Sequence, residues 1–370
     1  MELARYPWQR IGARVVEGID PPLLIIILSL SMLGFAALFS ASYEMPGRVL
    51  SQVMHLSLAL CAMWVTAQIA PQTLMRFAVP AYVIGIAFLI AVALFGDVVN
   101  GARRWLHVGV TRFQPSEMMK IAVPMMLAWY FHRREATLRL RDFAMAAILL
   151  MVPFGLIVRQ PDLGTASLVG AAGFYVIFFA GISWRLLGGL AALFTVALFP
   201  LWGLLHDYQR RRVLTLLDPT QDPLGAGYHI IQSTIAVGSG GISGKGWLNG
   251  TQAHLEFIPE RHTDFIFAVY SEEFGLIGNL ILLLLYILLI GRGLVIAANA
   301  ATVFARLIAG SMTLMFFTYA FVNMGMVSGI LPVVGVPLPF LSYGGTALLT
   351  LFIGAGILMS VQRHRKLVQT

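Results

Sequence analysis

The sequence predicts an all-α, polytopic membrane protein. The chain of 370 residues is 58% hydrophobic and 11% charged, whereas a soluble domain has about 25% charged residues. Its mean hydropathy is +0.82, and ten apolar stretches approach the roughly 20 residues that a helix needs to cross a bilayer. The net charge of +8 therefore does not indicate nucleic-acid binding, because basic residues in membrane proteins mainly set topology and contact anionic lipids.

Each predicted span is an apolar stretch bounded by polar or helix-breaking residues. The first has an apolar run longer than the 7–15 residues of a signal-peptide core, so we expect an uncleaved helix there. The fourth and fifth are the shortest of the set. The ten predicted spans are residues 22–42, 49–69, 77–96, 117–131, 143–158, 164–182, 186–205, 265–290, 307–327 and 346–361.

The distribution of basic residues predicts the topology. Fourteen Lys and Arg residues fall at the two termini and in the loops after spans two, four, six and eight, and six fall in the short loops on the opposite side. The positive-inside rule then places both termini in the cytoplasm. A large loop between spans seven and eight, about residues 206–263, faces outward. We expect one integral membrane domain over residues 1–370.

Three outward segments are unusual for a chain that only crosses a membrane. They are residues 100–120, the large loop, and residues 329–346, which hold three prolines and a Gly-Gly pair. Proline and glycine prevent a regular helix over the last segment. Irregular backbone near membrane depth is tolerated only inside protein or beside water. Because all three lie on one side, we expect them to line one outward cavity.

Acidic residues lie at the start of span eight. Asp264 is either an acid at the mouth of a cavity or a helix-start carboxylate, which is worth only about 0.3–1 kcal/mol. Glu260 and His262 are either its partners or solvated side chains. Glu272 and Glu273 lie inside the span, where an ionisable group usually faces the bundle interior. We expect one of them to be a structural partner of a buried Arg or of a polar neighbour.

Several cations are predicted on the outward side. Arg103, Arg104, Lys120 and Arg210 are candidates for binding an anionic headgroup, because guanidinium and ammonium groups suit phosphate oxygens; attraction to membrane lipids is the alternative for each. Glu117 precedes Lys120 by three residues, so the two share a helix face and are expected to pair. Asp162 is expected to make a local ion pair or a helix cap.

Other features give weaker signals. The Gly-rich stretch 238–246 lacks the strand–loop–helix context of a phosphate loop. The single Cys61 cannot form an intramolecular disulfide. The sequence shows no metal-ligand cluster of Cys and His.

Several blocks together resemble the SEDS (shape, elongation, division and sporulation) family, over about residues 22–366. The blocks are GARRW (101–105), FQPSEMMK (113–120), QPDLGT (160–165), GAGYHIIQS (225–233), FIPERHTDFIF (257–267), NMGMVSGILPVVGVP (323–337) and FLSYGGTA (340–347).

The resemblance implies a ten-helix peptidoglycan glycosyltransferase that polymerises lipid II outside the bacterial plasma membrane, for cell-wall elongation and rod shape. It implies a class B penicillin-binding protein, a transpeptidase, as partner within an elongation complex. The family's catalytic aspartate falls at Asp264. The matching blocks also make Gln114, Glu117, Lys120, Glu260 and His262 candidates for substrate binding, together with the cations Arg103, Arg104 and Arg210.

The expected reaction is an inverting displacement of undecaprenyl pyrophosphate with Asp264 as the base. Arginine side chains, or a divalent cation such as Mg²⁺ or Mn²⁺, would stabilise the departing pyrophosphate. Two alternatives come from other classes. A lipid II flippase should carry polar groups near the midplane, and a non-enzymatic scaffold for the transpeptidase should tolerate substitution of Asp264.

Overall fold

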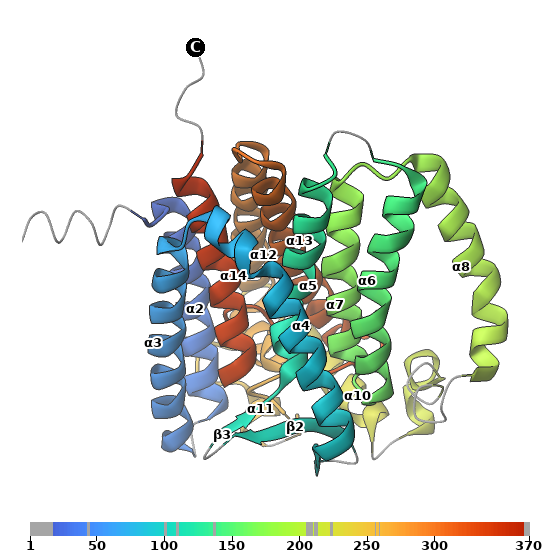
Figure 1. Ribbon diagram of the computed structural model, residues 1–370. Coiled ribbons are helices and arrows are strands. Elements are labelled where there is room, and N and C mark those ends of the chain that lie inside the picture. The colour runs from blue at the N-terminus through green and yellow to red at the C-terminus, as the bar shows by residue number, and fades with distance from the viewer. Residues whose placement is uncertain are drawn as a thin grey trace, which may run out of the picture.

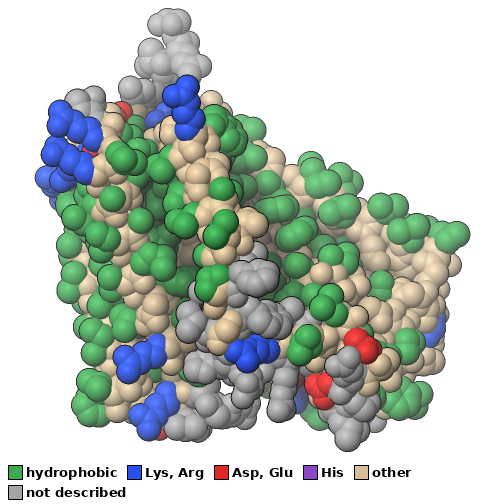
Figure 2. Space-filling view, turned by 90° about the vertical axis from the view of Figure 1, so that its right-hand side faces the viewer, with side chains coloured by type: hydrophobic (Ala, Val, Ile, Leu, Met, Phe, Trp, Pro, Cys, Tyr) green, Lys and Arg blue, Asp and Glu red, His purple; other side chains and the backbone are tan. Residues whose placement is uncertain are grey.

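The computed structural model describes residues 18–365, apart from residues 43–44, 100–101, 109–110, 136–137, 205–209, 211–213, 223–224, 256 and 259. Long helices stand side by side in a bundle, and a small sheet closes one end (Figure 1). Lys and Arg side chains gather at the two ends of the molecule, and the band between them is mostly hydrophobic (Figure 2). This distribution fits a protein that crosses a membrane.

The helices and strands follow one another along the chain. They are α2 (Pro21–Ala41), α3 (Pro46–Gln68), α4 (Pro71–Phe95), β1 (Asp97–Val99), β2 (Ala102–Val108), β3 (Thr111–Phe113), α5 (Pro115–His132), α6 (Leu140–Arg159), α7 (Leu163–Phe179), α8 (Trp184–Leu204), the 3₁₀ helix η1 (Pro219–Gln221), α10 (Ala226–Ser239), α11 (Thr251–His254), α12 (Ile266–Ala298), α13 (Val303–Val327) and α14 (Gly345–Arg363).

The predicted all-α membrane class is confirmed, since each predicted span overlaps a helix. Among the described residues, seven helices are long and apolar enough to cross a membrane, and α7 and part of α8 are shorter apolar helices. The count of ten crossings stays a prediction. The small antiparallel sheet, ordered β1-β2-β3, is an exception that the sequence did not predict, because its strands are too short to show periodicity.

Helix starts lie earlier in the chain than the apolar counts suggested. The third span was expected from residue 77, yet α4 begins at Pro71. Proline is well suited to the first helical turn because the N–H groups of that turn have no acceptor within the helix. Gln72 and Thr73 in the first turn, and Arg76 in the second, kept this part of the helix out of a count based on hydrophobicity.

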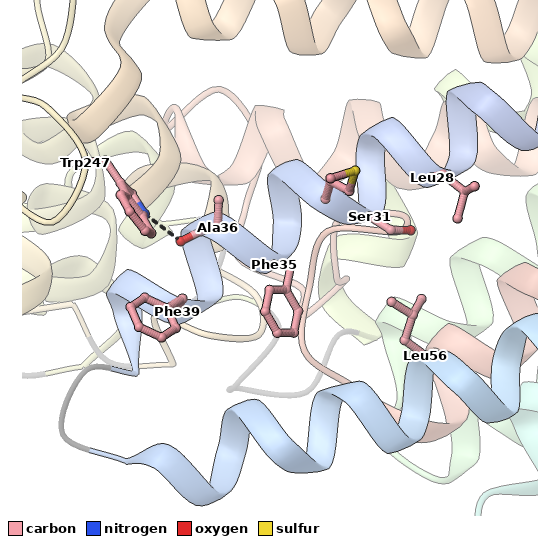
Figure 3. Close-up of a pocket in the computed structure, with 8 residues that line it drawn as sticks. Leu28, Ser31, Phe35, Ala36, Phe39, Leu56 and Trp247 are labelled. Carbon is pink, nitrogen blue, oxygen red and sulfur yellow. Dashed lines mark hydrogen bonds between the residues drawn. The ribbon is translucent and has the colours of Figure 1, made fainter.

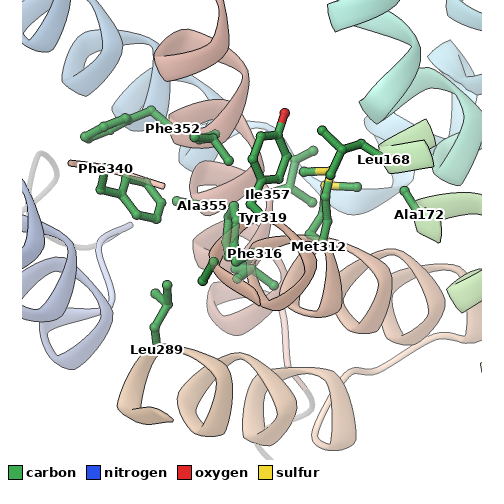
Figure 4. Close-up of a cluster of buried hydrophobic side chains, with 14 of the residues drawn as sticks. Leu168, Ala172, Leu289, Met312, Phe316, Tyr319, Phe340, Phe352, Ala355 and Ile357 are labelled. Carbon is green, nitrogen blue, oxygen red and sulfur yellow. The ribbon is translucent and has the colours of Figure 1, made fainter. Parts of the chain in front are cut away.

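The core lies around α13, which packs against α12, α7, α5 and α14. Phe316 of α13 meets Phe340 edge to face at 5.4 Å between ring centroids, and Phe340 meets Phe352 of α14 at 5.2 Å (Figure 4). Phe340 belongs to the irregular segment between α13 and α14 and is buried. This segment therefore returns into the bundle, where protein surrounds its irregular backbone as expected.

Helix α12 is broken at Gly275, whose φ of 64° and ψ of −158° are not helical. The Gly-rich segment 241–246 fills the break: the amides of Lys245 and Gly246 donate to the carbonyls of Glu272 and Glu273, both at 3.0 Å. The amide of Leu276 donates in turn to the carbonyl of Gly241 at 2.9 Å. The glycines thus allow a close approach of two backbones.

The two glutamates beside this break have the structural partners expected of at least one of them. Glu272 is fully buried and accepts from the Lys245 ammonium at 2.6 Å and from the Thr251 hydroxyl at 3.0 Å. Glu273 accepts a short hydrogen bond from the Ser40 hydroxyl of α2. The pair therefore ties the large loop and α2 to α12.

Candidate active site

Asp264 lies in the turn that leads into α12, but it does not cap that helix. The N-cap residue is Phe265, with no side-chain capping bond. Among the described residues, the Asp264 carboxylate accepts no hydrogen bond. Asp264 therefore makes no capping bond, but it lies directly before the N-cap of α12, where the helix dipole favours a negative charge.

The backbone around Asp264 is fixed by α13 and by the irregular segment that follows it. The Asn323 amide of α13 donates to the Asp264 carbonyl at 2.8 Å and to the Val336 carbonyl at 2.7 Å. The Ser342 hydroxyl donates to the Thr263 carbonyl at 2.7 Å. These bonds attach the turn to a packed core, so the backbone that carries the carboxylate is fixed in place.

The carboxylate itself faces Gly335. A β-carbon on that glycine would lie 3.3 Å from Asp264 Oδ2, and Gly335 has a φ of +72°. A residue with a side chain would therefore be strained at this position and would crowd the acid. The glycine leaves room on one side of the carboxylate.

Burial changes the acidity of Asp264. Loss of solvent raises the pKa of its carboxyl to about 6, and the nearby Glu260 carboxylate adds to the effect because a second negative charge disfavours ionisation. A base with a pKa close to the working pH is well matched to accept a proton. Asp264 is thus a stronger base than an ordinary aspartate, yet is still largely ionised near pH 7.5.

Two histidines flank the acid. His262 Nε2 contacts the guanidinium of Arg48 at the start of α3. The ring of His229 stacks on Phe265 with 5.6 Å between centroids. Burial lowers the pKa of His229, and the carboxylates of Glu260 and Asp222 oppose that change.

A second polar cluster joins β2, α5 and α7. Gln114 donates to Asp162 Oδ2 at 3.1 Å, and Arg104 donates to the Pro161 carbonyl at 2.6 Å. The other carboxylate oxygen of Asp162 accepts from the Thr165 amide at 3.1 Å, which confirms the helix cap expected there. Gln114 and Arg104 are therefore both held at the N-terminus of α7.

This cluster lies next to the Asp264 turn. At Gly164, in the first turn of α7, a β-carbon would lie 2.5 Å from the carbonyl oxygen of Val334. Val334 directly precedes Gly335, which the Asp264 carboxylate faces. Two of the three outward segments, and the end of the large loop, therefore meet at one place, as the expectation of a shared cavity requires.

The predicted pair of Glu117 and Lys120 is confirmed, but it is buried. Lys120 donates to Glu117 Oε1 and to the Tyr319 hydroxyl, each at 2.5 Å, and Lys120 is only 2% exposed. Tyr319 and Asn323 lie one helical turn apart on α13 and so share a face. The same face of α13 therefore supports the ion pair and the Asp264 backbone.

The other predicted cations lie elsewhere. The Arg103 side chain is exposed on β2. Arg210 donates to the Gly203 carbonyl at 2.6 Å, near the end of α8, the helix that stands apart from the bundle in Figure 1; this placement gives no support to a role at Asp264. Arg211 and Arg212 lie outside the described residues.

The described part of the chain has no group of three or more His, Cys, Asp or Glu side chains that could hold a metal ion. The side chains present therefore do not fit a protein-held metal centre, and a divalent cation stays a prediction.

Besides a cavity of about 280 Å³ between α12 and α13, two apolar cavities lie between helices of the described chain. One, of about 290 Å³, lies between α4, α5 and α14, with Phe113, Glu117 and Thr346 in its wall. The other, of about 360 Å³, lies between α2 and α3 and is closed by Trp247, whose indole N–H donates to the Ala36 carbonyl (Figure 3). Only the first has an ionisable group of the polar clusters in its wall.

Sequence reasoning missed two of the residues that support the site. They are Arg48, a single charge before a predicted span, and Tyr319, an aromatic residue inside a predicted span, and neither position carries a local signal of function. Asn323 was noticed only as part of a family block, although an amide inside an apolar span is itself a signal, because such a group needs a partner there.

Comparison with known proteins identifies the family. The FtsW/RodA/SpoVE family model, described as a cell cycle protein, matches residues 21–367. The peptidoglycan glycosyltransferase MrdB of Escherichia coli K12 is 53% identical over 352 residues, which covers 95% of each chain. The peptidoglycan glycosyltransferase RodA of Treponema pallidum is 33% identical and covers 95% of this chain and 99% of its own.

Solved structures agree with these matches. A chain from a peptidoglycan synthase complex, described as coordinating polymerization and crosslinking, superposes with a TM-score of 0.82 at 36% identity, covering 94% of this chain and 99% of that one. The rod shape determining protein RodA of Thermus thermophilus superposes with a TM-score of 0.71 at 30% identity, covering 94% and 97%. The predicted resemblance is thus confirmed, and the chain belongs to the FtsW/RodA/SpoVE family of multi-pass membrane proteins.

Proposed function

We propose that this protein is a peptidoglycan glycosyltransferase that polymerises lipid II, with Asp264 as the catalytic base. The observation that supports the proposal is the partly buried Asp264 carboxylate, whose pKa is raised. Hydrogen bonds fix its backbone at the point where residues 100–120, the end of the large loop and residues 329–346 meet. Family membership supports the reaction class, since relatives that cover almost the whole chain bear the name peptidoglycan glycosyltransferase.

The reaction is a single displacement at a sugar carbon. The 4-hydroxyl of a GlcNAc attacks C1 of a MurNAc, a β-1,4 bond forms, and the bond from C1 to the undecaprenyl pyrophosphate oxygen breaks. The hydroxyl proton passes to the Asp264 carboxylate. Because the donor linkage is α and the product is β, one displacement inverts the anomeric carbon.

The departing pyrophosphate carries charge that needs positive partners. Arg48 is joined to the Asp264 turn through His262, and Arg104 is anchored beside α7. Both guanidinium groups keep further N–H donors, of which each has five. Lys120 is buried against Glu117 and would act by neutralising that carboxylate, which would otherwise oppose the binding of pyrophosphate.

The lipid tail needs a lateral route out of the polar site. The cavity between α4, α5 and α14 is mostly apolar, and the side chains of Glu117 and Thr346 lie in its wall. Among the described residues, Glu117 Oε2 is buried and has no hydrogen-bond partner. We assign this cavity to the polyprenyl chain, with Glu117 near the headgroup.

The orientation and the partner belong to the same proposal. The positive-inside pattern places both termini in the cytoplasm and Asp264 at the outer face of the plasma membrane. A transpeptidase of the class B penicillin-binding proteins is the proposed partner, supported by the likeness to a chain of a complex that coordinates polymerization and crosslinking.

The test is polymerisation of labelled lipid II by the purified protein with its transpeptidase, comparing the wild type with Asp264→Asn. Asparagine keeps the size of the side chain and removes the base. We expect glycan strands from the wild type and at least a hundredfold less from the variant, the usual scale of a lost general base. Glu135→Gln, which neutralises an acid after α5, should retain full activity.

Folding of the variant is checked separately. Charging Asp264 is disfavoured by burial, so Asp264→Asn should melt at or above the temperature of the wild type and still bind the transpeptidase. Equal product from both proteins would refute the assignment of the base. Loss of polymerisation in both, with lipid II crossing vesicle membranes, would support a flippase instead; no polymerisation or transport, with a normally activated transpeptidase, would support a scaffold.

A further inference from the structure

A polar cleft lies at the end of the molecule opposite to Asp264. It has a volume of about 430 Å³ and lies between the start of α2, α12 and the end of α14, with Asp20, Arg292, Gln362, Arg363 and Arg365 in its wall. Arg292 lies 16 residues beyond Leu276, the first residue after the break in α12, which at the helical rise is roughly 24 Å. The cleft is therefore separate from the glycosyltransferase site.

Its wall is strongly basic. Three guanidinium groups face one carboxylate, which leaves an excess of two positive charges. Arg292 is the one that is neutralised: its Nε and Nη2 donate to the two carboxylate oxygens of Asp20 at 3.0 and 2.5 Å. The excess charge therefore comes from Arg363 and Arg365, which are both exposed.

Neutral amides hold these arginines in place. With its oxygen turned toward the guanidinium groups, Gln362 accepts from Arg365 Nη1 at 3.2 Å and from Arg292 Nη2 at 3.1 Å. Arg363 donates a short hydrogen bond to Gln68 of α3. An amide positions a guanidinium without cancelling its charge, so further N–H donors stay available for an anion.

We infer that this cleft binds the phosphodiester headgroup of an anionic phospholipid. Guanidinium forks match phosphate oxygens, and basic pockets between helices at the cytoplasmic surface are suited to such headgroups. The cleft lies at the end of an apolar bundle, where a lipid presents its phosphate and an apolar chain can lie against the neighbouring helices. Free phosphate would offer the same oxygens without that chain.

The test measures lipid retention by the purified full-length protein. Phosphatidylglycerol or phosphatidylcholine is added in detergent, and native mass spectrometry records the bound lipid. The cleft variant is Arg363→Gln with Arg365→Gln. The matched control is Arg185→Gln with Arg306→Gln, which removes the same charge from exposed positions outside the cleft. If the double variant folds poorly, lipid binding is measured with the single variant Arg365→Gln instead.

We expect the wild type to retain phosphatidylglycerol in preference to phosphatidylcholine, and the cleft variant to bind phosphatidylglycerol about thirtyfold more weakly, the effect of two surface cations on an anionic lipid. The control should bind like the wild type. Equal loss in the cleft variant and the control would overturn the site in favour of general surface charge. If inorganic phosphate displaced phosphatidylglycerol at equal concentration, the lipid assignment would be wrong.

Discussion

At the scale of single residues, the site depends on one acid whose surroundings make it a base. Burial and the Glu260 carboxylate raise the pKa of Asp264 to about 6. In an unfolded chain the pKa would be near 3.9. The folded state therefore favours the protonated acid, and this contribution to stability is fully present below pH 4 and is lost as the pH rises through about 6. Above pH 6 Asp264 is ionised, as a base must be, and the folded state no longer has this contribution to its stability.

The raised pKa predicts a pH profile. The rate of polymerisation should be constant above about pH 7 and should fall by about tenfold for each unit below pH 6, because only the ionised carboxylate accepts a proton. Glu260→Gln should move this acid limb to lower pH, since it removes a charge that raises the pKa of Asp264. Initial rates across the pH range, with Glu135→Gln as control, check this. A limb that stays in place in Glu260→Gln would contradict the assignment.

Asn323 is the second residue on which the site depends. It is fully buried and donates to the carbonyls of Asp264 and Val336. Asn323→Ala should lower the free energy of unfolding by about 2–4 kcal/mol through two lost hydrogen bonds and a cavity, and should lower kcat at least tenfold because the acid is displaced.

Thermal melting and initial rates together measure these effects of Asn323→Ala. Asn299→Ala serves as the control, because Asn299 is exposed and its side chain donates only to the Val295 carbonyl. A stable Asn323→Ala protein with normal kcat would show that the amide does not position Asp264.

At the scale of elements, the break in α12 holds the large loop to the bundle. A β-carbon at Gly275 would lie 2.3 Å from the Gly244 amide nitrogen and 2.8 Å from the Ile242 carbonyl oxygen. Its backbone conformation, with φ of 64° and ψ of −158°, is also one that only glycine adopts readily. The hydrogen bonds across the break therefore require a glycine there.

Gly275→Ala should destabilise the protein by about 1–3 kcal/mol and release segment 241–246 from α12. Gly291→Ala is the matched control in the same helix, since a β-carbon there meets nothing within 4 Å and alanine favours a helix. Melting temperature and hydrogen exchange of residues 241–246 report the outcome. Equal melting of the two variants would mean that the break is not needed for stability.

For the molecule as a whole, the proposed route of the lipid tail depends on the packing of α4, α5 and α14 against one another. Ile121 lies in the cavity wall. Ile121→Trp should fill part of it and raise the KM for lipid II with a long prenyl chain by about tenfold, the effect of losing contact with about two methylene groups at 0.8 kcal/mol each. The KM for a short-chain analogue should change less than twofold.

The control for this substitution is Ile148→Trp on α6, where the side chain is 56% exposed. It adds the same bulk outside the cavity and should leave both KM values unchanged. If Ile121→Trp raised the KM of the long-chain and short-chain substrates equally, the cavity would not bind the polyprenyl chain of lipid II.

The membrane class, the approximate place of each long helix and the family could be predicted from the sequence, because these depend on local hydrophobicity and on contiguous motifs; the helix ends, such as the start of α4 at Pro71, could not. It also indicated Asp264 and the pairing of Glu117 with Lys120, which are close in the chain. The packing of the bundle decided that Lys120 is buried beside Tyr319, that Arg48 meets His262 and that Gly335 faces the acid. These contacts join residues far apart in the chain, and no local pattern specifies which helix faces meet in a packed bundle.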